Sequence, residues 1–169
     1  EQRGIQELPE AFAAQLTNIQ TGREVVNIDT RKSVVSFADG EKLKYERLVS
    51  TMPLISLAQR ADRPELKMLA EGLRHTTVSV INMVIRGRLP DQAHWMYFPD
   101  PALDFYLISF PKNFFEKATP SDEQILSVEV GGRDPRPDID KIRARVEEQV
   151  GNLDIFEIEE HLFTHCDVI

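Results

Sequence analysis

TTVSVINMVIRG, residues 76–87, is rich in β-branched side chains and long enough to cross the middle of a sheet. We therefore predict a central β-strand here, and the other elements are assigned around it. After a short loop at residues 87–90 come three more segments that are plausible strands. They read HWMYF (94–98), DFYLISF (104–110) and EQILSVEV (123–130). A last apolar segment, IFEIEEHLF at 155–163, predicts the final strand.

Upstream of the central strand, residues 24–54 have the pattern of a β-meander. Val26 and Ile28 alternate with polar neighbours, and Val35 and Phe37 do the same. Two turn signals, DTRK and ADGE, separate these alternating runs, and the second contains Asp-Gly. The pattern predicts three antiparallel strands followed by an apolar exit strand, RLVSTMP, that ends at its proline.

Three segments have helical periodicity. The first, residues 8–16, has Pro9 in its first turn, and the second, residues 63–73, has Pro64 near its start. The third, residues 137–150, carries one apolar stripe formed by Ile139, Ile142, Val146 and Val150. The connections between the strands are too short for crossover helices, so the strands should be antiparallel neighbours. The predicted fold class is α+β, a mainly antiparallel sheet with helices on one face, with a domain boundary near residue 60.

Composition restricts the classes of function. The chain has 169 residues, 41% of them hydrophobic, and a formal net charge of -8, which argues against a nucleic-acid partner. Cys166 is its one cysteine, so no internal disulfide can form, and a reducing, cytoplasmic location is the simplest prediction. No apolar run approaches the roughly 20 residues of a membrane-spanning helix.

No catalytic residue and no metal ligand is predicted. His161 and His165 fall on a predicted strand, where a spacing of four places them on one face but about 13 Å apart. The glycines at 131–132 are separated from the next helix by residues 134–135, which favours a flexible loop over a phosphate cradle. Cys166 and its neighbour His165 should point to opposite faces of the strand, which argues against a nucleophile and base pair.

Aromatic side chains gather in one region. Eight of the thirteen aromatic residues (nine Phe, three Tyr and one Trp in all) lie between residues 95 and 115. On an alternating strand Trp95 and Tyr97 share one face, and Met96 and Phe98 share the other. Either both faces are buried in a larger parent protein, or the face with the indole N–H and the phenol O–H lines a site for a planar ligand.

The order of these segments resembles a known family. RGIQELPEAFAAQL followed by residues 24–54 is similar to the middle of the FAD-dependent flavin-containing amine oxidases, where a short helix precedes a Val-x-x-Ile strand, a Gly-containing hairpin and a Thr-x-Pro exit. Four later segments follow in the order seen in the eukaryotic-type UDP-galactopyranose mutases and their bacterial relatives. They are LVSTMPL, HTTVSVINMVIRGRLP, HWMYFPDP and DFYLISFPKNFF.

The resemblance implies that two parts of the chain belong to different domains. Residues 1–60 would be the helix and meander associated with the FAD domain, and residues 61–169 the substrate-binding domain. The Rossmann-type half that binds FAD would lie upstream, so we expect a fragment that does not hold FAD by itself.

The resemblance also implies particular site residues. The backbone of Val25 would contact the adenine part of FAD. Trp95 and Tyr97 would line the substrate pocket near the flavin. Asn113 matches the asparagine of the last motif and is assigned to substrate binding, with its role left open.

One position departs from the mutase pattern. Leu107 stands where the mutases have an arginine that pairs with the substrate pyrophosphate, and a diphosphate needs clustered cations. Lys112 and Arg86 are the candidates to replace it.

The predicted function is therefore a fragment of an FAD-dependent oxidoreductase of the amine oxidase type, with a small-molecule substrate. The alternatives are a UDP-galactopyranose mutase-like nucleotide-sugar isomerase and a non-catalytic interaction domain. A homodimer is expected through the apolar surface that the missing half would cover.

Overall fold

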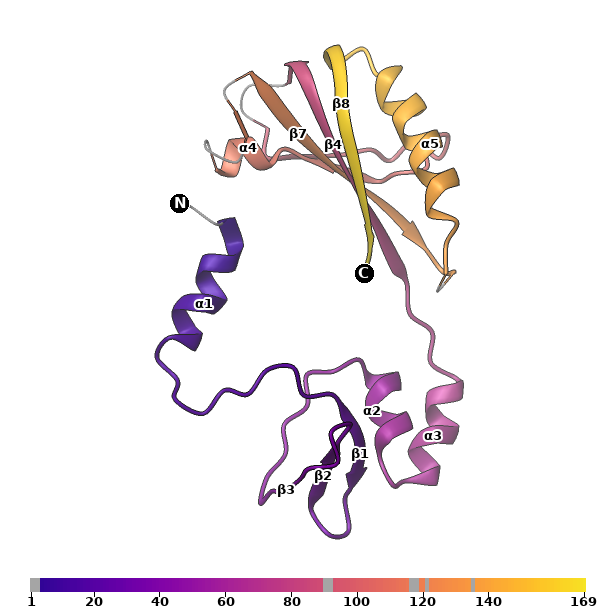
Figure 1. Ribbon diagram of the computed structural model, residues 1–169. Coiled ribbons are helices and arrows are strands. Elements are labelled where there is room, and N and C mark those ends of the chain that lie inside the picture. The colour runs from indigo at the N-terminus through magenta and orange to yellow at the C-terminus, as the bar shows by residue number, and fades with distance from the viewer. Residues whose placement is uncertain (1–3, 90–92, 116–118, 121, 135) are drawn as a thin grey trace. The chain divides into compact units, whose positions relative to one another are not determined.

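The computed structural model describes residues 4–89, 93–115, 119–120, 122–134 and 136–169 (Figure 1). The fold is α+β, as predicted, and its described strands form a three-stranded and a five-stranded antiparallel sheet. The chain divides into two compact units, one formed by Ala11–Arg74 and the other by His75–Ile169 with the first residues of the chain. The domain boundary predicted near residue 60 stays a prediction.

The unit Ala11–Arg74 contains the predicted meander. Strands β1 (Val25–Asp29), β2 (Val34–Phe37) and β3 (Lys42–Lys44) pair in sequence order. The first turn uses the backbone N–H of Lys32, which donates to Asp29 Oδ1 at 2.8 Å. The second turn uses Gly40 at a φ of 86°, a conformation that glycine adopts without strain.

Two short helices follow the meander, α2 (Leu54–Arg60) and α3 (Pro64–Glu71). Asp62, between them, accepts hydrogen bonds from the backbone N–H and the hydroxyl of Thr30, both at 2.7 Å. Arg63 Nε donates to the same hydroxyl at 2.7 Å. These bonds fasten the helical pair to the end of β1.

The exit strand predicted at residues 47–53 was wrong. The third strand ends at Lys44, residues 48–52 are in no strand, and helix α2 begins directly after Pro53. A strand needs a hydrogen-bonded neighbour, and Val49 in this segment is 89% exposed. Apolar β-branched residues alone do not form a strand where no partner strand pairs with them.

The unit His75–Ile169 is built on the five-stranded sheet, in the order β5-β6-β7-β4-β8. Its strands are β4 (Thr77–Arg88), β5 (Trp95–Tyr97), β6 (Leu107–Ser109), β7 (Glu123–Gly132) and β8 (Glu157–Val168). The predicted central strand is confirmed, because β4 pairs along most of its length with β7 on one side and β8 on the other. Burial alternates strictly along β4 from Thr77 to Ile85.

Helix α5 (Ile139–Gly151) runs alongside β4 and β8 (Figure 1). Asp138 caps it by accepting from the backbone N–H of Lys141 at 3.2 Å. Val146 and Val150 of the predicted apolar stripe are fully buried. They belong to a core that includes Ile81 and Ile85 of β4, so one face of the sheet is covered by this helix.

The remaining helical segments are short. Helix α1 (Glu7–Ala13) follows a single 3-10 turn (Gly4–Gln6) and confirms the helix predicted at 8–16, although it ends earlier. Helix α4 (Pro111–Phe114) was not predicted. Among the described residues, none of the helices has both the length and the apolar character needed to cross a membrane.

Candidate functional site

The strand register places a set of side chains on the face of the sheet that α5 does not cover. In an antiparallel pair, residues directly opposite each other share a face. The pairs Trp95↔Ser109 and Tyr97↔Leu107 continue through β7 into β4 and β8. We call this surface the aromatic face, and its members include Trp95, Tyr97, Leu107, Ser109, Ser127, Glu129, Val80, Asn82, Val84, Phe163 and His165.

The aromatic side chains of this face are solvent-exposed. Trp95, Tyr97 and Phe163 are 53%, 67% and 57% exposed. Met96 and Phe98, on the other side of the same strand, pack against the core. The predicted division of HWMYF into two faces is therefore confirmed. The outer aromatics are not buried within the described residues, and their assignment to a ligand site stays a prediction.

A stack of rings orients Trp95. Its indole lies 5.9 Å from the ring of Phe114 with an interplanar angle of 18°, and His94 meets Phe114 edge-on at 4.7 Å. Asn113, next to Phe114, donates from its side-chain amide to the carbonyl of Ala93 at 2.6 Å. This bond ties helix α4 to the residues that lead into β5. Asn113 thus supports the Trp95 segment, and its predicted contact with substrate stays a prediction.

The polar groups in the middle of the aromatic face are paired with one another. Ser127 Oγ donates to the side-chain oxygen of Asn82 across β7 and β4. Next to the face, the Tyr106 hydroxyl donates to the carboxylate of Glu129. That hydrogen bond, with partial burial, raises the pKa of Tyr106 to about 12. The phenol therefore keeps its proton at any physiological pH.

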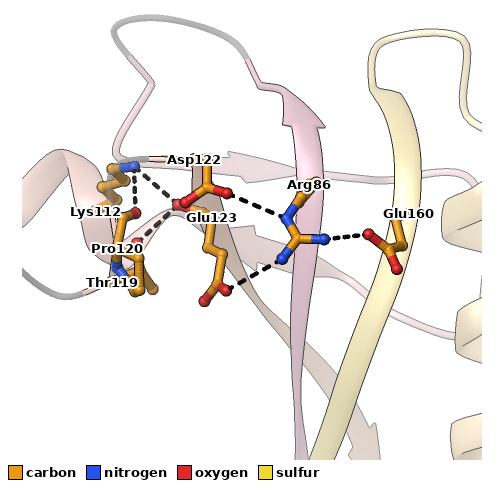
Figure 2. Close-up of polar contacts among 7 residues, drawn as sticks. All are labelled: Arg86, Lys112, Thr119, Pro120, Asp122, Glu123 and Glu160. Atoms are coloured by element: carbon orange, nitrogen blue, oxygen red, sulfur yellow. Dashed lines mark hydrogen bonds and ion pairs between the residues drawn. The ribbon is translucent and has the colours of Figure 1, made fainter.

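An ion-pair cluster borders the aromatic face at the far end of β4, and Figure 2 shows it. Arg86 Nε lies 3.2 Å from Asp122, and its terminal nitrogens reach Glu160 and, at 3.8 Å, Glu123. The hydrogen bond that Arg86 donates to Glu160, together with the negative charge of that carboxylate, raises the pKa of the guanidinium. Three carboxylates from β8, β7 and the loop before β7 thus surround this one cation.

Lys112 is also occupied (Figure 2). Its ammonium donates to the backbone carbonyls of Pro120 at 3.2 Å and Glu123 at 2.8 Å. The two cations considered as replacements for the arginine missing at Leu107 therefore both have protein partners. Neither is presented to a diphosphate in this structure.

Val25 lines an open groove in the other unit. The groove has a volume of about 420 Å³, and its walls come from the meander and from residues 48–52. The carbonyl of Val25 accepts from Arg60 Nε at 2.7 Å, so this backbone position is held in place. Ser50 also lines the groove, and its hydroxyl is buried with no hydrogen-bond partner in the described part of the chain.

The two histidines of β8 lie on opposite faces, which corrects the same-face expectation. A bulge skips Leu162, so His161 pairs with Ile85 and His165 pairs with Asn82. On the α5 side, His161 contacts Thr164 at 2.7 Å, whereas His165 lies 3.2 Å from Asp167. Within the described residues no group of three or more His, Cys, Asp or Glu could hold a metal ion.

The sequence matches the flavin containing amine oxidoreductase family over residues 2–166. The chain belongs to this family. The resemblance read from its segments is thereby confirmed at the family level. Flavin as a cofactor is a property of the family, and the contacts of FAD with this chain stay predictions.

Several solved structures share the fold of this chain. A reduced UDP-galactopyranose mutase superposes with a TM-score of 0.76 at 20% identity, over 93% of this chain and 37% of the mutase. A Pyrococcus furiosus protein gives 0.71 at 14% identity, over 96% and 41%. The CLA-producing fatty acid isomerase from P. acnes gives 0.63 at 13%, over 96% and 38%. At these identities the likeness shows the fold, and the chain spans about two fifths of each protein.

Sequence reasoning missed the Arg86 cluster and the Ser127–Asn82 pair. Arg86 is 36 residues from Asp122 and 74 residues from Glu160 in the chain. Ser127 is 45 residues from Asn82. Only the strand register brings them together. A signal was available for Ser127, because it sits at an alternating position of a strand whose other side is apolar.

Proposed function

We propose that this chain supplies the substrate-binding side of an FAD-dependent oxidoreductase of the amine oxidase type. The observation that carries the proposal is the exposure of Trp95, Tyr97 and Phe163 on one face of a sheet whose other face is a closed core. Exposed aromatic residues grouped on a rigid sheet are typical of a binding wall. The aromatic face is therefore the wall against which a substrate is held.

The residues of this chain fit part of FAD. The groove beside Val25 is mainly apolar and contains the unpartnered hydroxyl of Ser50, which suits a planar ring with polar edges. Its walls offer no cation for a diphosphate, and the sequence contains no Gly-x-Gly-x-x-Gly segment. Val25 and Ser50 would thus contact a ring portion of the cofactor. When bound, the flavin supplies a two-electron acceptor for a C–H bond.

The chain's own residues then have positioning roles. Trp95 and Tyr97 exclude water and orient the substrate by ring contact. Asn82 and Ser127, already hydrogen-bonded to each other, offer their remaining donor and acceptor capacity at the centre of the face. Tyr106 keeps its proton on the phenol oxygen and directs it to Glu129. This face carries Glu129 and Asp167, whereas Arg86 at its border is already paired with carboxylates.

The mutase alternative has weaker support. A UDP-sugar requires cations for its two phosphates. Leu107 lies on the aromatic face and brings none, and Arg86 and Lys112 are bound to protein groups. The fold likeness to the mutase does not supply the missing charge.

The proposal is tested with a flavin-loaded protein that contains this chain together with a domain that binds the FAD diphosphate. The protein is mixed anaerobically with each of a panel of aliphatic and aromatic amines. Loss of the visible absorbance of the flavin shows that it has been reduced and identifies that amine as a substrate. Trp95→Ala and Tyr97→Ala are each expected to lower kcat/KM for that substrate about tenfold, a loss of roughly 1.4 kcal/mol of transition-state binding. Phe12→Ala, an exposed aromatic of α1 outside the aromatic face, is the matched control.

Two results would contradict the proposal. One is tight binding of a UDP-sugar without net reduction of the flavin, which would favour the mutase. The other is kinetics that neither Trp95→Ala nor Tyr97→Ala changes.

A further inference from the structure

A second cavity lies on the α5 side of the sheet. It has a volume of about 290 Å³ and is bounded by the start of β4, the end of β7 and the first turn of α5. The two buried polar residues of the described chain, Thr77 and Ser79, both line it, at 7% and 3% exposure. They sit on the face opposite Trp95 and Tyr97, so this cavity is separate from the proposed substrate wall.

The Ser79 hydroxyl has no hydrogen-bond partner among the described residues. Thr77 donates from Oγ1 to the backbone carbonyl of Asp134 at 3.0 Å, which satisfies its hydroxyl. Among the described residues Ser79 makes no side-chain hydrogen bond, although it is 97% buried and lines the cavity. The Ser79 oxygen is not enclosed by protein atoms, so its hydroxyl can donate to a group inside the cavity.

Two unpaired cations line the same cavity. Arg133 and Lys141 contribute to its wall, and in the described structure neither side chain has an ion pair or a hydrogen bond. Two carboxylates, Asp134 and Asp138, line the cavity as well. Each is held by a backbone N–H, because Asp134 accepts from that of Arg136 at 2.9 Å and Asp138 from that of Lys141 at 3.2 Å, whereas the two cations have no such bond among the described residues. The positive end of the 13-residue helix α5 adds to the local field.

We propose that this cavity binds the phosphate or carboxylate group of a small anionic ligand. Arg133 and Lys141 supply the positive charge, and the Ser79 hydroxyl donates a hydrogen bond to the anionic group. The glycines at 131–132 have no side chains, so only backbone atoms form that part of the cavity wall. The site goes beyond the proposed oxidoreductase function and does not depend on it.

The experiment is isothermal titration of the 169-residue chain with inorganic phosphate and, separately, with succinate, at constant ionic strength set with sodium chloride. Saturable binding of one ligand per chain is expected. Arg133→Gln with Lys141→Gln should weaken it at least tenfold, and Ser79→Ala about tenfold, because a hydrogen bond to a charged group is lost. Lys67→Gln on α3 is the matched control and should leave the affinity unchanged.

The two ligands distinguish the source of the anionic group. Binding of phosphate assigns a phosphorylated ligand, and binding of succinate alone assigns a carboxylate. Circular dichroism of each variant shows whether its fold is retained, and Ser79→Ala removes only one oxygen. The proposal is overturned if neither anion binds at constant ionic strength, or if the Arg133 and Lys141 variant binds as well as the unaltered chain.

Discussion

Asp62 links the segment between helices α2 and α3 to the end of strand β1. It receives both hydrogen bonds of Thr30, from the backbone N–H and from the hydroxyl. These bonds favour the charged carboxylate and lower its pKa below the ordinary 3.8. A carboxylate whose pKa is depressed in the folded state stabilises the fold above its unfolded pKa, and that stability is lost as the pH falls through the folded pKa.

We therefore expect Asp62→Asn to change the acid sensitivity of the chain. The amide keeps a hydrogen-bond acceptor but cannot be protonated, so the melting temperature of the variant should fall less steeply than that of the unaltered chain between about pH 5 and pH 3. Thermal unfolding by circular dichroism at each pH measures this. Asp154→Asn, at a residue without a hydrogen bond or ion pair in the described structure, is the control. Identical slopes for Asp62→Asn and the unaltered chain would contradict the linkage.

Gly87 is fixed by the close approach of β8. Its φ is 145°, and a Cβ built on it would lie 1.9 Å from the carbonyl oxygen of Glu157. Gly87→Ala should lower the free energy of unfolding by at least about 2 kcal/mol, through backbone strain and steric overlap. Gly151→Ala, at the end of α5 where a Cβ meets nothing within 4 Å, should be neutral or stabilising by about 0.5 kcal/mol. Urea unfolding of both variants gives the comparison, and equal stability of the two would refute this account.

At the scale of elements, strand β4 separates a closed face from an open one. Ile81 is fully buried against the α5 side, whereas its neighbour Val80 is only partly buried on the aromatic face. Ile81→Ala should therefore cost about 3 to 4 kcal/mol and Val80→Ala about 1 kcal/mol. Urea denaturation of the chain measures both losses. Similar losses for the two variants would mean that the aromatic face is as closed as the core.

The elements also show what the sequence could predict. TTVSVINMVIRG and the stripe of α5 were predicted correctly because each has a long, regular period. The division of Trp95 and Tyr97 from Met96 and Phe98 followed from strand alternation alone. The bulge at Leu162 could not be predicted, because a skipped residue depends on how β8 pairs in space with Val84 and Ile85 of β4. The false strand at 47–53 had the same origin, since pairing partners are a long-range property.

At the scale of the whole molecule, the groove of the Ala11–Arg74 unit exposes a large apolar surface. Leu43 and Val49, both on its walls, are 59% and 89% exposed. Surface of this kind favours association, so we predict self-association at high protein concentration. Leu43→Lys with Val49→Lys should shift sedimentation toward the monomer, while Leu69→Lys, exposed on α3 outside the groove, should not. Concentration-independent sedimentation of the unaltered chain would contradict the prediction.

The same groove limits what the whole molecule can do with its cofactor. FAD is held in such folds mainly through its diphosphate, which requires a glycine-rich turn at a helix N-terminus. The chain has no such turn, and Val25 and Ser50 offer contacts for a ring alone. The purified 169-residue chain is therefore expected to be colourless, with no saturable FAD binding below about 1 mM. Visible absorption, acid extraction with chromatography of the supernatant, and titration with FAD measure this. A yellow preparation with one FAD per chain would show that these residues bind the whole cofactor, and the groove would then have to reach its phosphates.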